Sequence, residues 1–335
     1  MDIISTVGPK TKDKYIIKEL IDNGTTIFRL NCSHFYKEQF EEINTFIKRE
    51  HKNIKIMVDL CGRKVRVSRK LEYVYKVYIG EEVYFCSDSI YKELKKNNKE
   101  KKIVPLNINE KDFIEGKIKS ISMKDNTMKF KVIDEMDSII RAIALDEGVV
   151  RGGKGCNIVK ERQKKSSLSQ IDKGNIDWAI KNNVDIICQS FVEDQEDIRE
   201  IRKYLNNRCD ADIWAKIETE KGIDNIIDII KEVDTVVIGR GDLIPESNIL
   251  KAVKLENIII NECIKNKKNI IIGTHILDSM KKGNQPNLNE TESISFFIEK
   301  NIKGFLLAGE TSIGVAPVKT VKFLKDAIEY FEGEI

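Results

Sequence analysis

The sequence predicts an α/β protein, a (β/α)8 barrel with a small β-rich domain inserted after the third strand. Three observations support this prediction. Short apolar runs alternate with longer amphipathic segments along most of the chain, the alternation occurs eight times, and it is interrupted once, after Asp59. Repeated strand–helix alternation is typical of a ring of parallel strands surrounded by helices.

The eight apolar runs are rich in Ile and Val and are bounded by Gly, Asn or Asp, as expected for buried parallel strands. They span residues 3–7, 26–30, 54–60, 185–191, 212–217, 235–238, 269–273 and 304–307. The helical patterns between and after them span residues 14–22, 37–50, 176–182, 196–206, 224–231, 250–265, 290–299 and 318–331. This order predicts a TIM barrel.

The interruption has a different residue pattern. Residues 76–85 and 118–132 alternate apolar and polar side chains, which indicates half-exposed strands, and residues 124–126 have the composition of a hairpin tip. We therefore expect a catalytic barrel of residues 1–67 and 161–335, and an inserted β lid domain over residues 68–160. Residues 92–102 carry six Lys and two Glu, which we interpret as a solvated loop.

Composition argues against several classes of function. The 57 basic and 54 acidic side chains give a net charge of +3, without the basic excess of a nucleic-acid-binding domain. The longest apolar runs are too short to span a bilayer, and the N-terminus does not resemble a secretory signal. Seven scattered Cys without a CxxC motif favour reduced thiols, and three His argue against a His-rich metal site. We expect a cytoplasmic protein without nucleic-acid or membrane partners.

Polar and ionisable residues follow the predicted strands at their carboxyl ends, where the chemistry of such a barrel is located. Polar strand ends are common because they meet solvent, but this explains one or two of them better than seven. In strand order they are Arg29 with Asn31, Ser33 and His34; Asp59; Gln189 with Ser190; Lys216 with Glu218; Arg240 with Asp242; Thr274 with His275; and Glu310 with Thr311.

The spacing of the charged residues suggests a metal site. Residues two apart in a strand share a face, so Lys216 and Glu218 are expected to point the same way, as are Arg240 and Asp242. Glu218 and Asp242 would then lie on adjacent strands, with room for substrate oxygens and water, which suits Mg2+. The alternative is that each carboxylate only pairs with its basic neighbour. Basic groups beside a metal suit an anionic substrate.

Long, ordered segments surround these strand ends: residues 6–9 (Thr-Val-Gly-Pro), 29–34 (Arg-Leu-Asn-Cys-Ser-His), 59–66, 216–218 (Lys-Ile-Glu), 239–243 (Gly-Arg-Gly-Asp-Leu), 274–280 (Thr-His-Ile-Leu-Asp-Ser-Met), 307–311 and 317–318. In these segments the sequence resembles the pyruvate kinase family. The resemblance covers the barrel, the position of the insertion and nearly the whole chain.

The resemblance implies a phosphotransferase that moves the phosphoryl group of phosphoenolpyruvate to ADP or another nucleoside diphosphate, giving pyruvate and the triphosphate. It implies Lys216, Thr274 and Arg29 as catalytic residues. Gly241 and Asp242 would bind substrate together with Lys216 and Thr274. Glu218 and Asp242 would be ligands of Mg2+ or Mn2+.

The resemblance also implies a nucleotide site and a monovalent-cation region. Asn31, His34, Arg66 and Lys154 would bind the nucleotide, with Lys154 reaching from a lid that excludes water. Asn31, Ser33, Asp59 and Lys64 would form the cation region. Lys64 falls where the family has either glutamate or lysine, and a tethered ammonium can replace the ion. We therefore expect that K+ is not required.

Departures from the family pattern keep two alternatives open. Cys61 and Arg63 replace a usual lysine and proline, and His275 replaces a glutamine beside Thr274. The sequence ends after the eighth barrel helix, so we expect no C-terminal effector domain, and any homo-oligomer to form through barrel faces. One alternative is a paralogue in a dedicated biosynthetic pathway, with a different acceptor or enol acid. The other is a non-catalytic binding subunit.

Overall fold

The chain forms two compact units, each with its own hydrophobic core. The computed structural model describes residues 1–34, 37–62, 64–108, 110–115, 118–123, 127–136, 138–160 and 168–333. The first unit comprises Met1–Gly62 and Ser167–Ile335, and the second comprises Arg63–Ser166. The second unit therefore extends a few residues beyond each end of the expected insertion.

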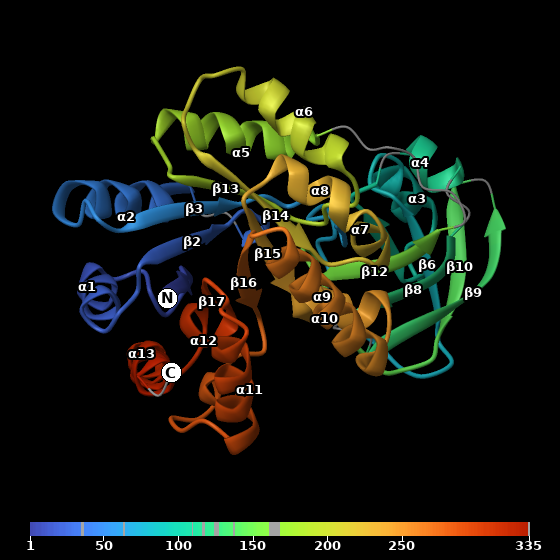
Figure 1. The fold of residues 1–335 in the computed structure, drawn as a ribbon. Helices are drawn as coiled ribbons and strands as arrows, with labels where there is room; N and C mark the ends of the chain where they lie inside the picture. Colours follow the sequence, from blue (N-terminus) through green and yellow to red (C-terminus); the bar gives the residue numbers. More distant parts are fainter. Residues whose placement is uncertain are drawn as a thin grey trace. The chain divides into compact units, whose positions relative to one another are not determined.

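Eight parallel strands close into a barrel in the first unit, as the sequence predicted (Figure 1). In ring order they are β1 (Asp2–Thr6), β2 (Ile27–Asn31), β3 (Lys55–Asp59), β13 (Ile186–Gln189), β14 (Asp212–Ile217), β15 (Thr235–Gly239), β16 (Asn269–Gly273) and β17 (Gly304–Leu307). The ring closes between β17 and β1, where Gly304 lies opposite Asp2. A Cβ on Gly304 would lie 2.3 Å from the Asp2 carbonyl oxygen, so only glycine permits this approach.

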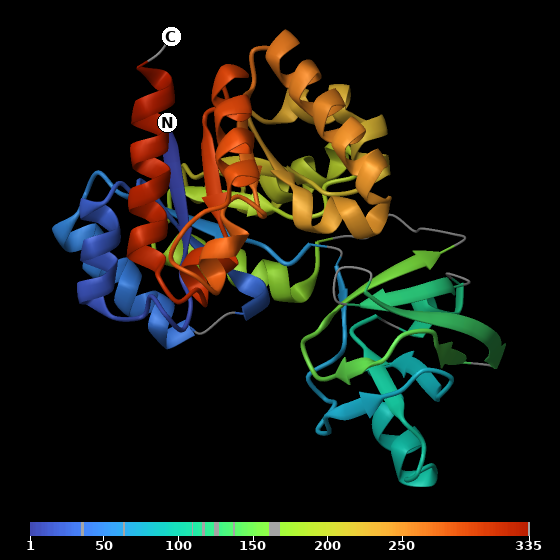
Figure 2. The same ribbon diagram turned by 90° about the horizontal axis from the view of Figure 1, so that it is seen from below.

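Helices follow each barrel strand. They are α1 (Lys14–Asp22), α2 (Lys37–Glu50), α5 (Gln170–Lys181), α6 (Gln195–Leu205), α7 (Glu220–Asp224), α8 (Ile226–Glu232), α9 (Arg240–Glu246), α10 (Ile249–Lys265), α11 (Leu288–Glu299), α12 (Gly309–Ser312) and α13 (Pro317–Glu332), with short 3-10 turns η1 (Cys32–His34) and η2 (Asp278–Lys281). Figure 2 shows α1 beside α13, and the Met1 amino group lies 3.8 Å from Glu332.

Two of the predicted helices differ from those observed. The pattern over residues 176–182 marks only the end of α5, which begins after Ser169, whose hydroxyl accepts the amide of Asp172. This N-terminal cap extends the helix into a segment that carries little apolar periodicity. The pattern over residues 224–231 is divided between α7 and α8, which share Asn225 as a boundary residue.

Apolar side chains fill the barrel in alternation with those that face the helices. Each strand contributes one or two side chains to the interior cluster: Ile4, Ile27, Met57, Ile186, Cys188, Trp214, Val237, Ile271 and Leu306. On β16, Ile270 and Ile272 instead join the larger core between the strands and the helices. The period of two thus assigns each strand residue to the interior or to the outer core.

In its described residues, the second unit is built mainly from strands, with two helices. A seven-stranded sheet has the order β4 (Val65–Arg66), β12 (Gly155–Lys160), β8 (Ile118–Met123), β9 (Met128–Met136), β10 (Ile139–Ala144), β6 (Glu82–Ser87) and β7 (Ile103–Leu106), and β5 (Tyr75–Val77) pairs with β11 (Gly148–Val150). β8 and β9 are antiparallel; residues 124–126, expected at their tip, lie outside the described residues.

One interpretation in this unit was wrong. Residues 92–102 were expected to form a solvated loop, but their first half belongs to α3 (Tyr91–Asn97). Tyr91 is buried in the core of the unit and anchors this helix, so the first half of the charged segment lies on a helix that packs against the core. A second helix, α4 (Glu110–Glu115), was also not predicted.

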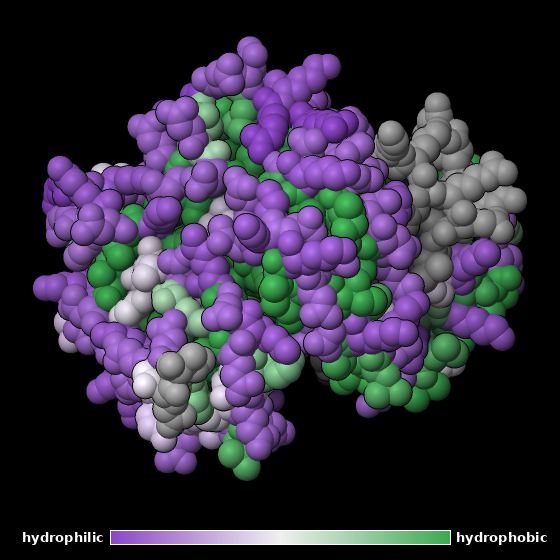
Figure 3. Space-filling model, viewed as in Figure 1, coloured by the Kyte–Doolittle hydropathy of each residue, from purple (hydrophilic) through white to green (hydrophobic). Residues whose placement is uncertain are grey.

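The surface drawn in Figure 3 is mostly hydrophilic, in keeping with the charged fraction of 33%. Among the described residues, no helix combines the length and the apolar character needed to cross a bilayer.

Candidate functional site

Polar side chains form the next layer of the barrel interior, directly after the apolar one. Arg29, Asp59 and Lys216 each follow an interior apolar residue by two positions, namely Ile27, Met57 and Trp214. Residues two apart in a strand share a face, so these three charged side chains enter the barrel at the carboxyl ends of the strands. Thr6 and Ser190 follow Ile4 and Cys188 in the same way.

The Asp59 carboxylate is the centre of this layer. Its Oδ2 accepts from Arg29 Nε at 2.7 Å and Nη2 at 2.5 Å, and from Lys216 Nζ at 3.0 Å. Its Oδ1 accepts from Ser190 Oγ at 2.9 Å. Arg29 also donates from Nη1 to Thr6 Oγ1 at 3.0 Å. The cluster is almost closed to solvent, with side-chain exposures of 2% for Asp59, 9% for Arg29 and 12% for Lys216.

The charges of this cluster stabilise one another. Burial alone would raise the pKa of Asp59, but Lys216 and Arg29 outweigh it and lower the pKa to about 2. Burial alone would lower the pKa of the Lys216 ammonium, but Asp59 and then Glu218 raise it above its usual value. Lys216 therefore remains a cation at neutral pH despite its burial.

Glu218 directly follows β14 and lies two positions after Lys216, on the same side of the chain. Its Oε1 lies 3.6 Å from Lys216 Nζ, as the two-residue spacing predicted, and its Oε2 accepts from the amide of Phe191 at 3.0 Å. The next strand leaves room for this side chain because a Cβ on Gly239 would lie 2.4 Å from Glu218 Cγ.

The expected shared face of Arg240 and Asp242 was wrong. β15 ends at Gly239, and both residues lie in α9, where positions two apart point in different directions. Asp242 occupies the first turn of this helix, and Arg240 turns toward the segment after β16.

Glu218 and Asp242 fit a hard divalent ion chemically, because carboxylate oxygens are the ligands that Mg2+ prefers. Gly239 provides the space beside Glu218 that a larger residue would fill. Within the described residues, no group of three or more His, Cys, Asp and Glu side chains could hold a metal. A site built on this pair would therefore take its other ligands from substrate and water.

Thr274 and His275 follow β16 in a left-handed conformation, with φ of 65° and 53°. The Thr274 hydroxyl accepts from the amide of Gly241 at 2.7 Å and donates to the carbonyl of Gly273 at 2.6 Å. Arg240 donates to the Thr274 carbonyl at 3.0 and 2.8 Å and also to the His275 carbonyl. The predicted substrate residues Gly241 and Thr274 are therefore in direct contact.

The residues predicted to bind nucleotide or a monovalent cation are divided between the two units. Asn31 lies opposite Asp59 in the β2–β3 pairing, and its side chain accepts from the amide of Ser33 at 3.0 Å. The backbone of His34 belongs to η1; its side chain lies outside the described part of the chain.

The other three predicted residues, Lys64, Arg66 and Lys154, belong to the second unit. Arg66 lies opposite Gly155 in the β4–β12 pairing and donates to the Gly153 carbonyl at 3.3 Å. Burial raises the pKa of the Cys156 thiol to about 12, although all three cations act to lower it. The Lys64 ammonium and the Arg66 guanidinium lie near Gly155, whereas the Lys154 ammonium donates to the Val149 carbonyl.

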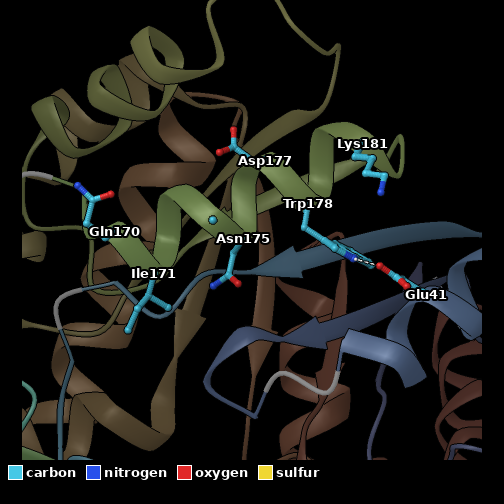
Figure 4. Close-up of a pocket in the computed structure, with 8 residues that line it drawn as sticks. Glu41, Gln170, Ile171, Asn175, Asp177, Trp178 and Lys181 are labelled. Carbon is cyan, nitrogen blue, oxygen red and sulfur yellow. Dashed lines mark hydrogen bonds between the residues drawn. The ribbon is translucent and has the colours of Figure 1, made fainter.

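A hollow of about 440 Å³ lies on the flank of the barrel, along α5 (Figure 4). Trp178 Nε1 donates to Glu41 at its wall, at 3.3 Å. No residue predicted to have a catalytic or binding role lines it; the lining residues are Glu41, Gln170, Ile171, Gly174, Asn175, Asp177, Trp178 and Lys181.

Comparison with known proteins assigns the family. Residues 1–321 match the family model for the pyruvate kinase barrel domain. The chain belongs to the pyruvate kinase family. It is 28% identical over 334 residues to a pyruvate kinase of Thermoplasma acidophilum, and 27% identical over 331 residues to a pyruvate kinase of Staphylococcus aureus. These alignments cover 99% and 97% of this chain but 58% and 55% of the relatives, so the chain spans just over half of their length.

Two residues of this candidate site were noted from the sequence only as strand ends, without a catalytic or binding role. The bond from Ser190 to Asp59 was not foreseen, and Arg240 was expected on a strand. The period of two from Cys188 could have identified Ser190 as an interior residue. No sequence signal indicated that Arg240 would hold the carbonyls after β16.

Replacing Asp59 by Asn should destabilise the fold, because it leaves Arg29 and Lys216 buried without a balancing charge. Loss of one partner from a buried ion pair costs about 3–5 kcal/mol. Urea denaturation at neutral pH measures this loss. Asp228→Asn, which removes an exposed partner of Lys231, is the matched control and should leave the unfolding free energy close to that of the wild type.

Comparison of the wild type with Asp59→Asn also tests the charge state of Asp59. The pKa of Asp59 is lowered in the folded state from 3.8 to about 2, so its stabilisation is complete above the higher value and is lost as pH falls toward the lower one. At about 1.4 kcal/mol per pKa unit, the difference between the two pKa values corresponds to about 2 kcal/mol of folding stability. Wild-type protein should lose more stability than Asp59→Asn between about pH 5 and pH 2; equal losses would contradict the assignment.

Proposed function

We propose that the protein transfers the phosphoryl group of phosphoenolpyruvate to ADP or another nucleoside diphosphate, forming pyruvate and the triphosphate. The observation that carries the proposal is Lys216, a buried ammonium held between Asp59 and Glu218 at the carboxyl ends of the barrel strands. Membership in the pyruvate kinase family supports it, because the relatives that match nearly the whole chain are named pyruvate kinases.

Lys216 would act by electrostatic stabilisation. Removal of the phosphoryl group leaves the enolate of pyruvate, and both groups carry negative charge in the transition state. A fixed cation stabilises this charge without reorganisation, which is how phosphoryl transfer is mainly catalysed. The ion pairs of Lys216 hold its ammonium in place before substrate arrives, at 3.0 Å from Asp59 and 3.6 Å from Glu218.

Glu218 and Asp242 would hold Mg2+ or Mn2+, which supplies positive charge to substrate oxygens and orients them. Gly241 would receive the substrate carboxylate through its amide. That amide now donates to Thr274 Oγ1 at 2.7 Å, so the carboxylate would compete with the threonine for it.

For the nucleotide we propose Asn31, His34, Arg66 and Lys154, with Arg29 toward the phosphates. The positive charges of Lys64 and Arg66, which lie near Gly155 in the second unit, support an anionic ligand there. The second unit would act as a lid that excludes water and limits hydrolysis.

The purified chain should form pyruvate from phosphoenolpyruvate, ADP and Mg2+ when K+ is omitted, with other nucleoside diphosphates tested in parallel. Coupled detection of pyruvate measures the rate. If the Lys64 ammonium replaces K+, Lys64→Glu should make the reaction depend on added K+. Activity of the wild type only in K+ would refute the role of Lys64. Absence of turnover with every diphosphate, with phosphoenolpyruvate still bound, would instead favour a paralogue with another acceptor.

Lys216→Met should reduce turnover by about a thousandfold, because it removes charge stabilisation in the transition state. Steady-state rates and circular dichroism are measured together, so that loss of activity is separated from loss of fold. Lys231→Met, on the exposed side of α8, is the matched control and should leave turnover unchanged. Near-normal turnover of Lys216→Met would show that the site is assigned incorrectly.

Asp242→Asn should weaken metal binding, since it replaces a charged ligand by a neutral one. Titration of Mn2+ followed by its paramagnetic resonance signal, without substrate, measures this directly. The dissociation constant should rise at least about tenfold, because even indirect partners of a metal ligand have effects of that size. Asp228→Asn serves as the control, and an unchanged affinity of Asp242→Asn would exclude the ligand role.

A further inference from the structure

The segment that follows β16 is held in a strained conformation. Left-handed backbone at a non-glycine residue costs about 1–3 kcal/mol and is concentrated at functional sites. Here two such residues are consecutive, Thr274 and His275. The Arg240 guanidinium binds the carbonyls of both, which keeps the pair in this conformation and fixes the directions of the two side chains.

The His275 ring is oriented by an acidic partner. Its Nδ1 is hydrogen-bonded to a carboxylate oxygen of Asp278, and the other oxygen of that carboxylate pairs with Lys281. The hydrogen bond with His275, together with that from Lys281, holds the pKa of Asp278 well below its usual range. A carboxylate at Nδ1 fixes the tautomer and stabilises the imidazolium, as in histidines that transfer protons.

The other nitrogen of the ring, Nε2, makes no hydrogen bond within the described residues, and the His275 side chain is 40% exposed. Among the described residues, the charged groups near this segment include Asp278, Lys281 and Arg240 of α9. Arg240 donates to the His275 carbonyl and itself faces Glu256 at 3.8 Å and Glu310 on α12.

Thr274 cannot be a net source of protons near neutral pH. Its hydroxyl accepts from Gly241 and donates to Gly273, so both its proton and a lone pair are engaged. A threonine that gives up its proton must recover one from another group. Imidazole is the side chain whose ordinary titration falls between about pH 5 and 8, and His275 is the next residue in the chain.

We propose that His275, oriented by Asp278, supplies the proton that converts the enolate of pyruvate into pyruvate. This inference rests on the proposed function. The Nε2–H bond breaks and the proton passes through water to the methylene carbon. There the enolate electron pair forms the new C–H bond, and the enolate C–O becomes a carbonyl. The neutral imidazole regains a proton from solvent, to which it is exposed.

Two reactions of the same protein separate this role from a structural one. Exchange of the methyl hydrogens of pyruvate with D2O, followed by proton NMR, reports proton transfer. Formation of ATP from phosphoenolpyruvate and ADP in a single turnover reports phosphoryl transfer. His275→Gln, which keeps a polar side chain but cannot carry a proton, should slow exchange about a hundredfold, the lower end of general acid–base effects. Phosphoryl transfer and the KM for phosphoenolpyruvate should remain unchanged.

A second variant tests the role of Asp278. Asp278→Asn should also slow exchange, because the ring loses the carboxylate that holds its Nδ1 and fixes its orientation. Phosphoryl transfer by this variant should remain unchanged. Exchange by Asp278→Asn at the wild-type rate would refute the orienting role. His51→Gln, at the residue that follows α2, is the matched control and should behave as the wild type.

The outcomes distinguish this inference from the proposed function. If the wild type forms pyruvate and His275→Gln exchanges protons at the wild-type rate, the role of His275 is wrong and the proposed function stands. If the wild type neither forms pyruvate nor exchanges its protons under any condition tested, the proposed function is wrong, and the role of His275 is refuted with it.

Discussion

The buried Asp59 carboxylate binds both Arg29 and Lys216, and the organisation of the barrel mouth depends on this balance of charge. Two cations this close and this poorly solvated would repel each other strongly without an anion between them. The three residues come from β2, β3 and β14, so their charges meet when these strands pair, through β13, in the observed register. The fold and the charge cluster therefore specify each other, and the cluster leaves Lys216 as a fixed cation beside Glu218.

The architecture was predictable because it follows from two strong periodicities. Runs of Ile and Val located all eight strands, and amphipathic segments located the helices that cover them. Arg29, Asp59 and Lys216 lie inside the barrel because each follows an interior residue, namely Ile27, Met57 or Trp214, by two positions. The alternation therefore identifies, from the sequence, side chains that share the barrel interior, without knowledge of the contacts between them.

What the sequence did not reveal depends on local backbone geometry. Arg240 and Asp242 were placed on a strand, but the chain turns at Gly239 into α9, and Arg240 then faces the carbonyls after β16. Thr274 and His275 adopt left-handed backbone conformations although neither is a glycine, so no residue type at these positions predicted them. Such features arise from tertiary contacts that override local preference, and they are expected where function has shaped the chain. The N-terminal cap of α5 at Ser169 and helix α3, which begins at Tyr91, were not predicted because neither depends on apolar periodicity.

The insertion has a consequence for how the barrel folds. Asp59 and Ser190 are bonded at 2.9 Å although they are 131 residues apart in sequence, and most of the intervening residues belong to the second unit. Within that unit β4 pairs with β12, so Val65 lies opposite Cys156 and the chain leaves the unit near the point where it entered. Once the second unit has folded around its own core, the connection between β3 and β13 is effectively a short loop. The entropic cost of pairing these two strands is then lower. Early folding of the insertion would therefore accelerate ring closure, and slow folding of the insertion would expose unpaired barrel strand edges to aggregation.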